Sequence, residues 1–172
     1  PRFSDVAIES VFAGEILGLS ELGITLGCEA GRFCPEDSVT RGEMAAFLVR
    51  ALGLELYTGD DTFRDDNQSA FEDQIETIRF HGITHGCALE MFCPDRPVTR
   101  AEMAAFLSRA FSLNRTSGDS FTDDDGSYFE PEIGTLEAAG VSSGCAPNQY
   151  CPGELVTRGE MAAFLIRALA AA

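Results

Sequence analysis

The chain has 172 residues, of which 28 are acidic and 12 are basic, and its formal net charge is −16 at pH 7. A field of this sign argues against a nucleic-acid partner, which needs a basic surface, and favours association with cations. The chain has no apolar run of transmembrane length, so we expect no membrane insertion. Any anion site must be local and built from individual arginines, because all 12 basic residues are arginine.

One unit occurs three times, and the three repeats lie at residues 1–54, 63–113 and 121–172. Successive repeats are offset by 59 and then by 58 residues, as the spacing of Arg41, Arg100 and Arg158 shows. Self-similarity at such a period indicates units that bury their apolar faces against one another rather than folding alone. We therefore expect one domain that spans residues 1–172.

Each repeat is predicted to open with a short helix. In the first repeat this helix runs roughly from Phe12 to Leu22 and ends at Gly23, because a glycine just past the last turn supplies the left-handed stop. The corresponding helices are predicted near residues 71–80 and 129–139.

A pair of cysteines with the spacing C-x5-C follows the first helix of every repeat. The pairs are Cys28 with Cys34, Cys87 with Cys93, and Cys145 with Cys151. Their recurrence at one place favours three local disulfides and an oxidising, extracytoplasmic setting. Zinc is the alternative in the second repeat, where His81 and His85 precede the cysteines, but the other two repeats have no histidine.

The second helix of every repeat is predicted to begin at the pattern Val-Thr-Arg-x-Glu-Met-Ala-Ala-Phe-Leu. Thr-x-x-Glu before an apolar run is a capping box. In the first repeat Met44, Phe47 and Leu48 have the spacing of one buried helical face. The arginine then occupies the first helical position, where we expect it to point outward beside free backbone amides and the positive end of the helix dipole.

These arginines are the candidates for contact with an anion. A guanidinium can bind a carboxylate or a phosphate through two hydrogen bonds, and capping alone needs no arginine at this position. The candidates are Arg41, Arg100 and Arg158. The alternative is that each arginine only pairs with a neighbouring acid, and that the threonine and glutamate of the motif act only as caps.

A second candidate site precedes the first helix of the third repeat. Asp123, Asp125, Ser127 and Glu130 alternate as oxygen ligands, a pattern that indicates calcium. The glutamate comes too early for an EF-hand, and Ser127-x-x-Glu130 is itself a capping box, as is Ser69-x-x-Glu72, so capping is favoured. No cofactor is required, and the absence of a catalytic arrangement of side chains predicts that the chain is not an enzyme.

The motifs together resemble the S-layer homology (SLH) repeat. They are Phe-x-Asp-Val, Gly-Ile-Thr-x-Gly, Phe-x-Pro and Val-Thr-Arg-x-Glu-Met-Ala-Ala-Phe-Leu-x-Arg-Ala-Leu, in this order. The resemblance implies a mainly α fold with three helix-loop-helix repeats in a pseudo-threefold arrangement around a central three-helix bundle, here with disulfide-tied loops. It also implies a noncatalytic, extracellular module of the bacterial cell surface. Such modules bind an anionic, often pyruvylated, secondary cell-wall polymer in grooves between repeats.

Carried over to this sequence, the groove motif of the family corresponds to Arg41, Arg100 and Arg158, with Glu43, Glu102 and Glu160 beside them. The aspartate that opens the family pattern corresponds to Asp5. The family tryptophan is absent, and Phe12, Phe71 and Phe129 lie nearest to its place. The alternative function is a self-assembling subunit of a surface layer or an extracellular filament, because the chain contains little besides the repeats and its disulfides suit an exposed homo-oligomer.

Overall fold

The structure of the chain is a computed structural model that describes residues 3–115 and 120–172. Within these ranges the chain forms α1 (Ala13–Glu21), α2 (Arg41–Leu52), α3 (Glu72–Phe80), α4 (Arg100–Ala110), α5 (Glu130–Ala138) and α6 (Arg158–Ala171). The mainly helical fold is therefore confirmed. None of the described helices is long and apolar enough to cross a membrane.

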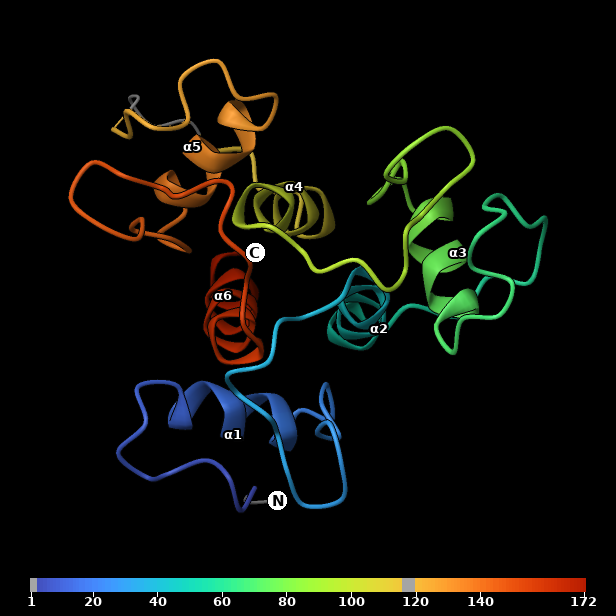
Figure 1. Cartoon of the computed structure of the whole chain (residues 1–172), viewed down its shortest axis with the longest axis horizontal. Coiled ribbons are helices and arrows are strands. Elements are labelled where there is room, and N and C mark those ends of the chain that lie inside the picture. Colours follow the sequence, from blue (N-terminus) through green and yellow to red (C-terminus); the bar gives the residue numbers. More distant parts are fainter. Residues whose placement is uncertain (1–2, 116–119) are drawn as a thin grey trace.

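The second helices of the repeats, α2, α4 and α6, lie at the centre and are seen end-on in Figure 1. We call them the central helices. The outer helices α1, α3 and α5 lie around them in three lobes, together with the loops. Each outer helix packs against the central helix of the preceding repeat, and α1 closes the circle by packing on α6. The two ends of the chain are thus joined by packing, although they are far apart in sequence.

A closed ring of three backbone hydrogen bonds joins the starts of the central helices. The amide of Val39 donates to the carbonyl of Val156 (3.0 Å), that of Val98 to Val39 (2.9 Å), and that of Val156 to Val98 (3.0 Å). All three valines are fully buried. Buried amides need such partners, so each repeat satisfies a polar group of another one.

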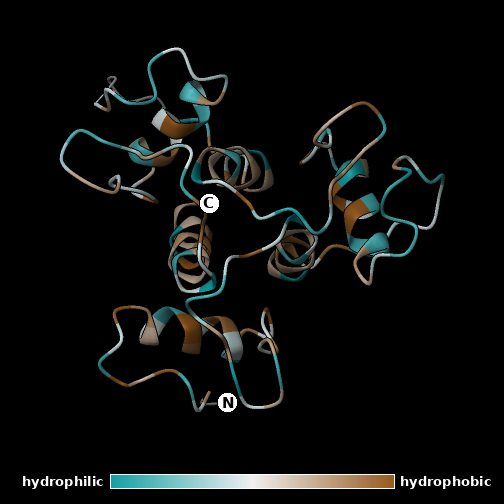
Figure 2. Cartoon of the chain, viewed as in Figure 1, coloured by the Kyte–Doolittle hydropathy of each residue, from teal (hydrophilic) through white to brown (hydrophobic). Residues whose placement is uncertain are grey.

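One hydrophobic core runs through all three repeats. Met44, Phe47 and Leu48 are buried in it, which confirms the helical face that their spacing predicted. In Figure 2 the hydrophobic segments lie on the outer helices as well as on the central ones. Because each outer helix is only two to three turns long, its stability comes from this packing rather than from helix propensity.

The bounds of the outer helices agree with the sequence-based prediction to within one residue at each end, but two of their N-caps do not. Gly23, Gly82 and Gly140 follow the helices in the left-handed conformation, each with φ of 71°. The predicted capping boxes of the second and third repeats are wrong, because the N-cap residues are Phe71 and Phe129 and neither cap has a side-chain hydrogen bond.

The serines of these two predicted boxes close tight turns instead. The hydroxyl of Ser69 accepts from the amide of Phe71, and that of Ser127 accepts from Phe129, both at 3.2 Å. Serine side chains that bond to the backbone two residues ahead compete with a cap. The N-caps therefore lie two residues later than the capping-box pattern suggested.

Candidate functional site

The capping boxes of the central helices are confirmed. Thr40 accepts through its hydroxyl from the amide of Glu43 (3.2 Å), and the Glu43 carboxylate accepts from the amide of Thr40 (2.9 Å). The same reciprocal pair joins Thr99 to Glu102 and Thr157 to Glu160. The threonine and the glutamate of the motif thus have the structural role that the sequence favoured for them.

The arginines of the motif do not point outward, and this part of the prediction is wrong. Arg41, Arg100 and Arg158 are only 3–4% exposed. Each side chain extends into the next repeat, where its Nε donates to a backbone carbonyl. The bonds are Arg41 to Phe92 (2.7 Å), Arg100 to Tyr150 (2.8 Å) and Arg158 to Phe33 (2.8 Å). The reason is that the neighbouring repeat offers both a carbonyl acceptor and a carboxylate at the helix start.

The carboxylates that meet these arginines are the capping glutamates of the next repeat. Nη1 to Oε1 distances are 3.2 Å for Arg41 and Glu102, 3.6 Å for Arg100 and Glu160, and 2.6 Å for Arg158 and Glu43. Each glutamate therefore holds its own helix start with one oxygen and a neighbouring arginine with the other. The three pairs run in one direction around the centre and bring together all six arginines and glutamates that the sequence singled out.

Two aromatic rings flank every one of these guanidinium groups. Arg41 lies 4.7 Å from the ring centroid of Phe92 and 5.2 Å from that of Phe106. Tyr150 and Phe164 flank Arg100, and Phe33 and Phe47 flank Arg158. Cation–π contacts of this kind favour a desolvated guanidinium and fix its plane.

The first backbone amides of the central helices are not free, in contrast to the expectation from sequence. The amides of Arg41 and Gly42 donate to the carbonyls of Arg96 (3.0 Å) and Pro94 (2.9 Å) in the next repeat. The starts of α4 and α6 are bound to neighbouring loops in the same way. An anion cannot use these amides, so any contact must come from side chains.

A pocket of about 180 Å³ opens beside Arg41, between α4 and the start of α5. We call it the Arg41 pocket, and its polar and aromatic lining comes from Arg41, His85, Glu102, Arg109, Tyr128 and Phe129. Nη2 of Arg41 is buried and has no hydrogen-bond partner among the described residues, and Nη2 of Arg158 is in the same state. The pocket thus has aromatic faces and is lined by an arginine whose Nη2, although not itself exposed to the pocket, lacks a hydrogen-bond partner among the described residues.

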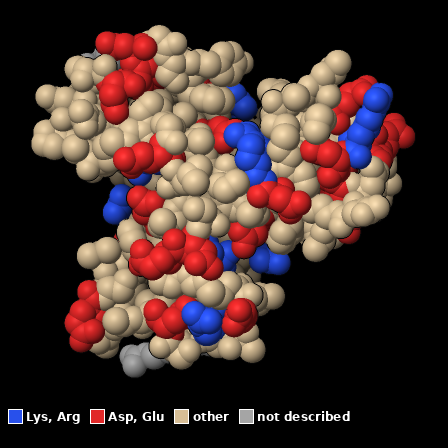
Figure 3. All heavy atoms as spheres, viewed as in Figure 1, with Lys and Arg blue, Asp and Glu red and all other residues tan. Residues whose placement is uncertain are grey.

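The charge around the Arg41 pocket limits what can enter it. Burial lowers the pKa of the Arg41 guanidinium, and the nearby charge of Glu102 opposes this shift. Arg109 forms an ion pair with Glu132 (3.0 Å) at the wall. Figure 3 shows acidic side chains over all three lobes of the visible face. The part of a ligand that enters the pocket should therefore carry a single localised negative group.

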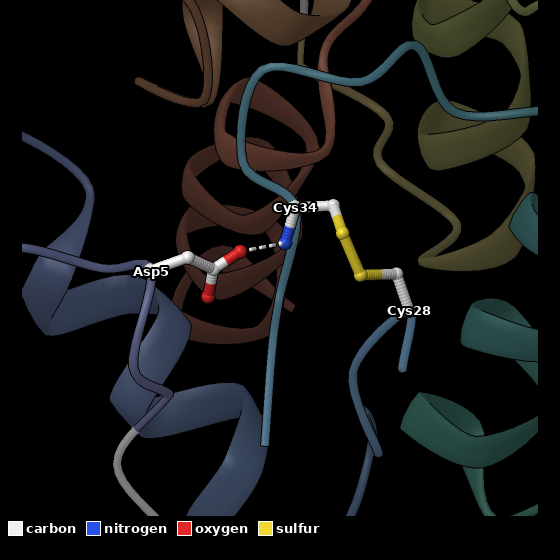
Figure 4. Close-up of side chains that lie close together, drawn as sticks. All are labelled: Asp5, Cys28 and Cys34. Atoms are coloured by element: carbon white, nitrogen blue, oxygen red, sulfur yellow. Dashed lines mark hydrogen bonds between the residues drawn. A yellow bond between two sulfur atoms is a disulfide. The ribbon is translucent and has the colours of Figure 1, made fainter. Parts of the chain in front are cut away.

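Asp5, the remaining ligand candidate, binds the backbone of its own repeat. Its two carboxylate oxygens accept from the amides of Phe33 (2.8 Å) and Cys34 (2.7 Å), as the close-up of Asp5 and the cysteines shows in part (Figure 4). Asp65 and Asp123 bind the corresponding amides of the other repeats. Burial acts to raise the pKa of Asp5, but the bonds from Phe33 and Cys34 outweigh it and lower the pKa.

The three local disulfides are confirmed, and no cysteine is free in the described residues. The second cysteine of each pair is left-handed, with φ of 56° at Cys34, 60° at Cys93 and 59° at Cys151. Side chains rarely adopt this conformation, so the disulfide and the aspartate hold the backbone there together. Zinc binds the thiolate form of cysteine, and a disulfide offers no thiolate. The zinc alternative is therefore excluded.

Three of the four residues of the calcium prediction have structural roles in the loop before α5, and the fourth, Asp125, is exposed. Asp123 binds two amides, Ser127 closes a turn, and Oε2 of Glu130 accepts from the amide of Gly126 (2.8 Å). Among the described residues, the carboxylates that converge to within 4.8 Å of one another are instead Asp61, Asp66 and Glu76 in the second repeat. Calcium at Asp123, Asp125, Ser127 and Glu130 stays a prediction.

Sequence reasoning missed most of the wall of the Arg41 pocket and the aromatic residue that receives each arginine. The sequence did contain a signal for the aromatic residue that receives each arginine. An aromatic residue directly precedes the later cysteine of the pair in every repeat (Phe33, Phe92 and Tyr150). The variable position of the motif also has a role. A Cβ atom at Gly42 would lie 2.6 Å from the ring of Phe71, so glycine lets the next lobe approach the helix start.

Comparison with known proteins identifies the repeats. The sequence model of the S-layer homology domain matches residues 2–45, 62–104 and 120–162. The chain is 37% identical to an endoglucanase of Bacillus sp. (strain KSM-635) over 63% of this chain and 12% of that protein. It is 31% identical to the surface-layer 125 kDa protein of Lysinibacillus sphaericus over 90% of this chain and 14% of that protein. It is 28% identical to the cellulosome-anchoring protein of Acetivibrio thermocellus over 83% of this chain and 34% of that protein. The chain thus spans a minor part of the length of each relative.

Proposed function

The chain belongs to the S-layer homology domain family, and we propose that it is a noncatalytic module that anchors a protein to an anionic cell-wall glycopolymer. Its setting is extracellular and associated with the cell wall, in agreement with its three disulfides. The endoglucanase match covers 12% of that protein and carries no catalytic role to this chain.

The observation that supports this proposal most directly is the Arg41 pocket. Nη2 of Arg41 is a buried donor without a partner among the described residues, and a shift of the pocket lining would let a carboxylate of a bound sugar satisfy it. Tyr128 is 83% exposed at the wall, and Phe129 lies beside it, so their rings can cover the apolar face of a sugar. A pyruvylated saccharide has both features, a localised carboxylate and an apolar face.

The remaining candidates are included in the proposal at different ranks. Arg158 also has an unsatisfied Nη2, so the start of α6 around Arg158 is the next site we propose. Arg100 follows by correspondence, and Glu43, Glu102 and Glu160 orient the three arginines through their ion pairs. The role of Asp5 in this scheme is indirect, because it shapes the loop that ends at Cys34.

Sedimentation with purified bacterial cell-wall sacculi tests the proposal. We expect the wild type to sediment with intact sacculi and to stay in solution with sacculi from which the secondary polymers have been extracted. Tyr128→Ala should weaken binding about tenfold, which corresponds to about 1.4 kcal/mol. Arg41→Lys keeps the charge but loses the planar donor set, and we expect the same direction.

The matched control is Arg64→Ala, because Arg64 is an exposed arginine that pairs with Glu90 outside the Arg41 pocket. It should sediment like the wild type. Equal binding to intact and extracted sacculi would refute a polymer ligand. Unchanged binding by Tyr128→Ala and Arg41→Lys would remove the Arg41 pocket from the site.

Self-assembly is the second candidate function. Three relatives are named as surface-layer proteins, and the chain covers 14%, 21% and 16% of their lengths. Leu26 lies two residues before Cys28, Leu89 lies between Cys87 and Cys93, and they are 77% and 91% exposed, so these segments offer apolar contacts to another copy. Static light scattering over a concentration series tests this function. A monomer at every concentration, with and without calcium, would contradict it.

A further inference from the structure

Three carboxylates converge in the second lobe, away from the Arg41 pocket. Asp61 comes from the segment that joins α2 to this lobe, Asp66 from the loop before α3, and Glu76 from α3 itself. One oxygen from each residue lies within 4.8 Å of the other two. Asp61 is exposed, whereas Asp66 is fully buried and Glu76 is 6% exposed. Two of the three acids are therefore largely removed from water.

Among residues 3–115 and 120–172, Asp66 has no partner for its charge. Neither of its carboxylate oxygens accepts a hydrogen bond from the described part of the chain. In the same ranges no ion pair joins an arginine to any of the three acids. A buried carboxylate without hydrogen bonds or counter-charge is strongly unfavourable, and native proteins resolve it by pairing, by protonation or by binding a metal.

The other two acids are held in position. Oε1 of Glu76 accepts from the amides of Thr62 (3.0 Å) and Phe63 (3.2 Å), which fixes its carboxylate against the chain that enters the lobe. Asp61 accepts from the side chain of Asn67. The cluster is thus a set of oriented oxygens rather than a group of free surface acids.

The first repeat shows that the fold does not need acids at these places. Val6 corresponds to Asp66 and Leu17 to Glu76, and both apolar side chains line one cavity of about 360 Å³. The third repeat has Asp124 and Gly134 at the two positions and so cannot supply the second carboxylate. The second repeat alone places two acids where an apolar pair suffices for folding.

We propose that Asp61, Asp66 and Glu76 bind a hard divalent cation, and that Ca²⁺ is the ion that fits them best. Oxygen is the only donor type in the cluster, which suits Ca²⁺ or Mg²⁺ rather than zinc. Ca²⁺ accepts carboxylates in mono- or bidentate mode and in irregular geometry, with water completing the shell, whereas Mg²⁺ demands a near-ideal octahedron. The bound ion would tie the segment that leaves α2 to the outer helix α3.

Electrostatics agrees with this geometry. Burial, and then the charges of Glu76 and Asp61, raise the pKa of Asp66 to about 7. The net charge of −16 also raises the local concentration of cations around the whole molecule. A divalent ion would remove the repulsion among the three acids.

Titration of the chelator-treated protein with CaCl₂ alone tests the proposal, by calorimetry and by thermal unfolding followed by circular dichroism. We expect a bound ion at the cluster. We also expect Tm to rise by about 5–10 °C at free Ca²⁺ about one hundred times Kd, and a smaller rise with MgCl₂. NaCl at equal ionic strength is the control for screening. A wild-type response no larger than that to NaCl would overturn the proposal.

Matched variants locate the ion. The double variant Asp66→Asn with Glu76→Gln keeps the shape and the acceptor for Thr62 and Phe63, and it should lose the calcium-specific rise in Tm. The pair Asp66→Val with Glu76→Leu copies the first repeat, so it should fold and should not respond to calcium. Asp73→Asn removes one exposed charge from the same helix and should respond like the wild type. A full response by either double variant would place the ion elsewhere and overturn the assignment.

Discussion

Arg158 at the start of α6 and Glu43 in the first turn of α2 form an ion pair with 2.6 Å between Nη1 and Oε1. The two residues are 115 positions apart in sequence. The Arg158 side chain is 3% exposed and that of Glu43 is 26% exposed, so a buried guanidinium joins the last repeat to a half-buried carboxylate of the first. With the pairs of Arg41 and Arg100, it makes the three repeats depend on one another in a closed order.

Replacement of Arg158 by alanine should destabilise the protein strongly. It leaves the Glu43 oxygen and the Phe33 carbonyl without their donor and opens a space between Phe33 and Phe47. Breaking a buried pair by removal of one partner costs about 3–5 kcal/mol. Urea unfolding followed by circular dichroism measures the loss. Arg64→Ala, which removes an exposed arginine, should cost less than about 1 kcal/mol. Equal losses for the two variants would contradict a structural role of the buried pair.

Asp5→Asn should lower stability at neutral pH. The amide group of asparagine can accept from only one of the two amides that Asp5 binds, those of Phe33 and Cys34. Hydrogen bonds to a charged acceptor contribute about 1.5–3 kcal/mol each, so we expect a loss of about 2 kcal/mol in urea unfolding. The matched control is Asp125→Asn, which removes an exposed charge in the third repeat. A loss at Asp125 as large as that at Asp5 would contradict the argument.

The contribution of Asp5 should also depend on pH, with a defined sign. Its pKa is lowered in the folded protein from the ordinary value of 3.8, because the two amide bonds outweigh the opposing effect of burial. The stabilisation is therefore complete above pH 3.8 and is lost as the pH falls below it through the folded pKa. Urea unfolding should be measured at pH 7, 4 and 3. The difference in the free energy of unfolding between wild type and Asp5→Asn should become smaller as the pH falls. A difference that grows as the pH falls would show that the assigned sign of this pH dependence is wrong.

Local signals made most of the fold predictable. The capping boxes at Thr40 and its equivalents, the glycine stops such as Gly23, and the C-x5-C spacing each involve residues within one short segment. These features are determined largely by local backbone geometry, so the sequence carries them directly. The serine turns show the limit, because Ser127 could cap a helix or close a turn and the sequence pattern suits both.

The direction in which the arginine side chains point could not be predicted from such local signals. Whether Arg41 points outward or inward depends on Phe92, 51 positions away, which offers a carbonyl and a ring. The same holds for the acid cluster, because its three acids come from the segment after α2, the loop before α3 and α3 itself, and these segments meet only in the folded lobe. Both sites arise from contacts between segments that the repeat pattern alone does not place.

Loss of one disulfide should lower the free energy of unfolding by a modest amount. Replacement of Cys145 and Cys151 by serine opens a loop with a sequence separation of 6 residues, for which the loop-entropy model gives about 2 kcal/mol. The double variant should unfold at a lower urea concentration. The slope of its unfolding free energy against urea concentration should be unchanged. Thiol titration of the unfolded wild type should find no free thiol before reduction. An unchanged urea midpoint would show that Asp123 alone holds the loop through the amides of Tyr150 and Cys151.

Removal of the third repeat should abolish cooperative folding, because the other two repeats rely on it at several places. A chain that ends at Leu113 loses α6, against which α1 packs, and the Val156 carbonyl that accepts from Val39. It also loses the donor of Glu43. We expect no sharp thermal transition by circular dichroism and strong binding of a hydrophobic dye. Addition of a separate peptide of residues 120–172 should restore the transition, since the contacts between repeats need no covalent link. If the shortened chain unfolded cooperatively with a midpoint temperature within a few degrees of that of the full chain, two repeats would suffice for folding.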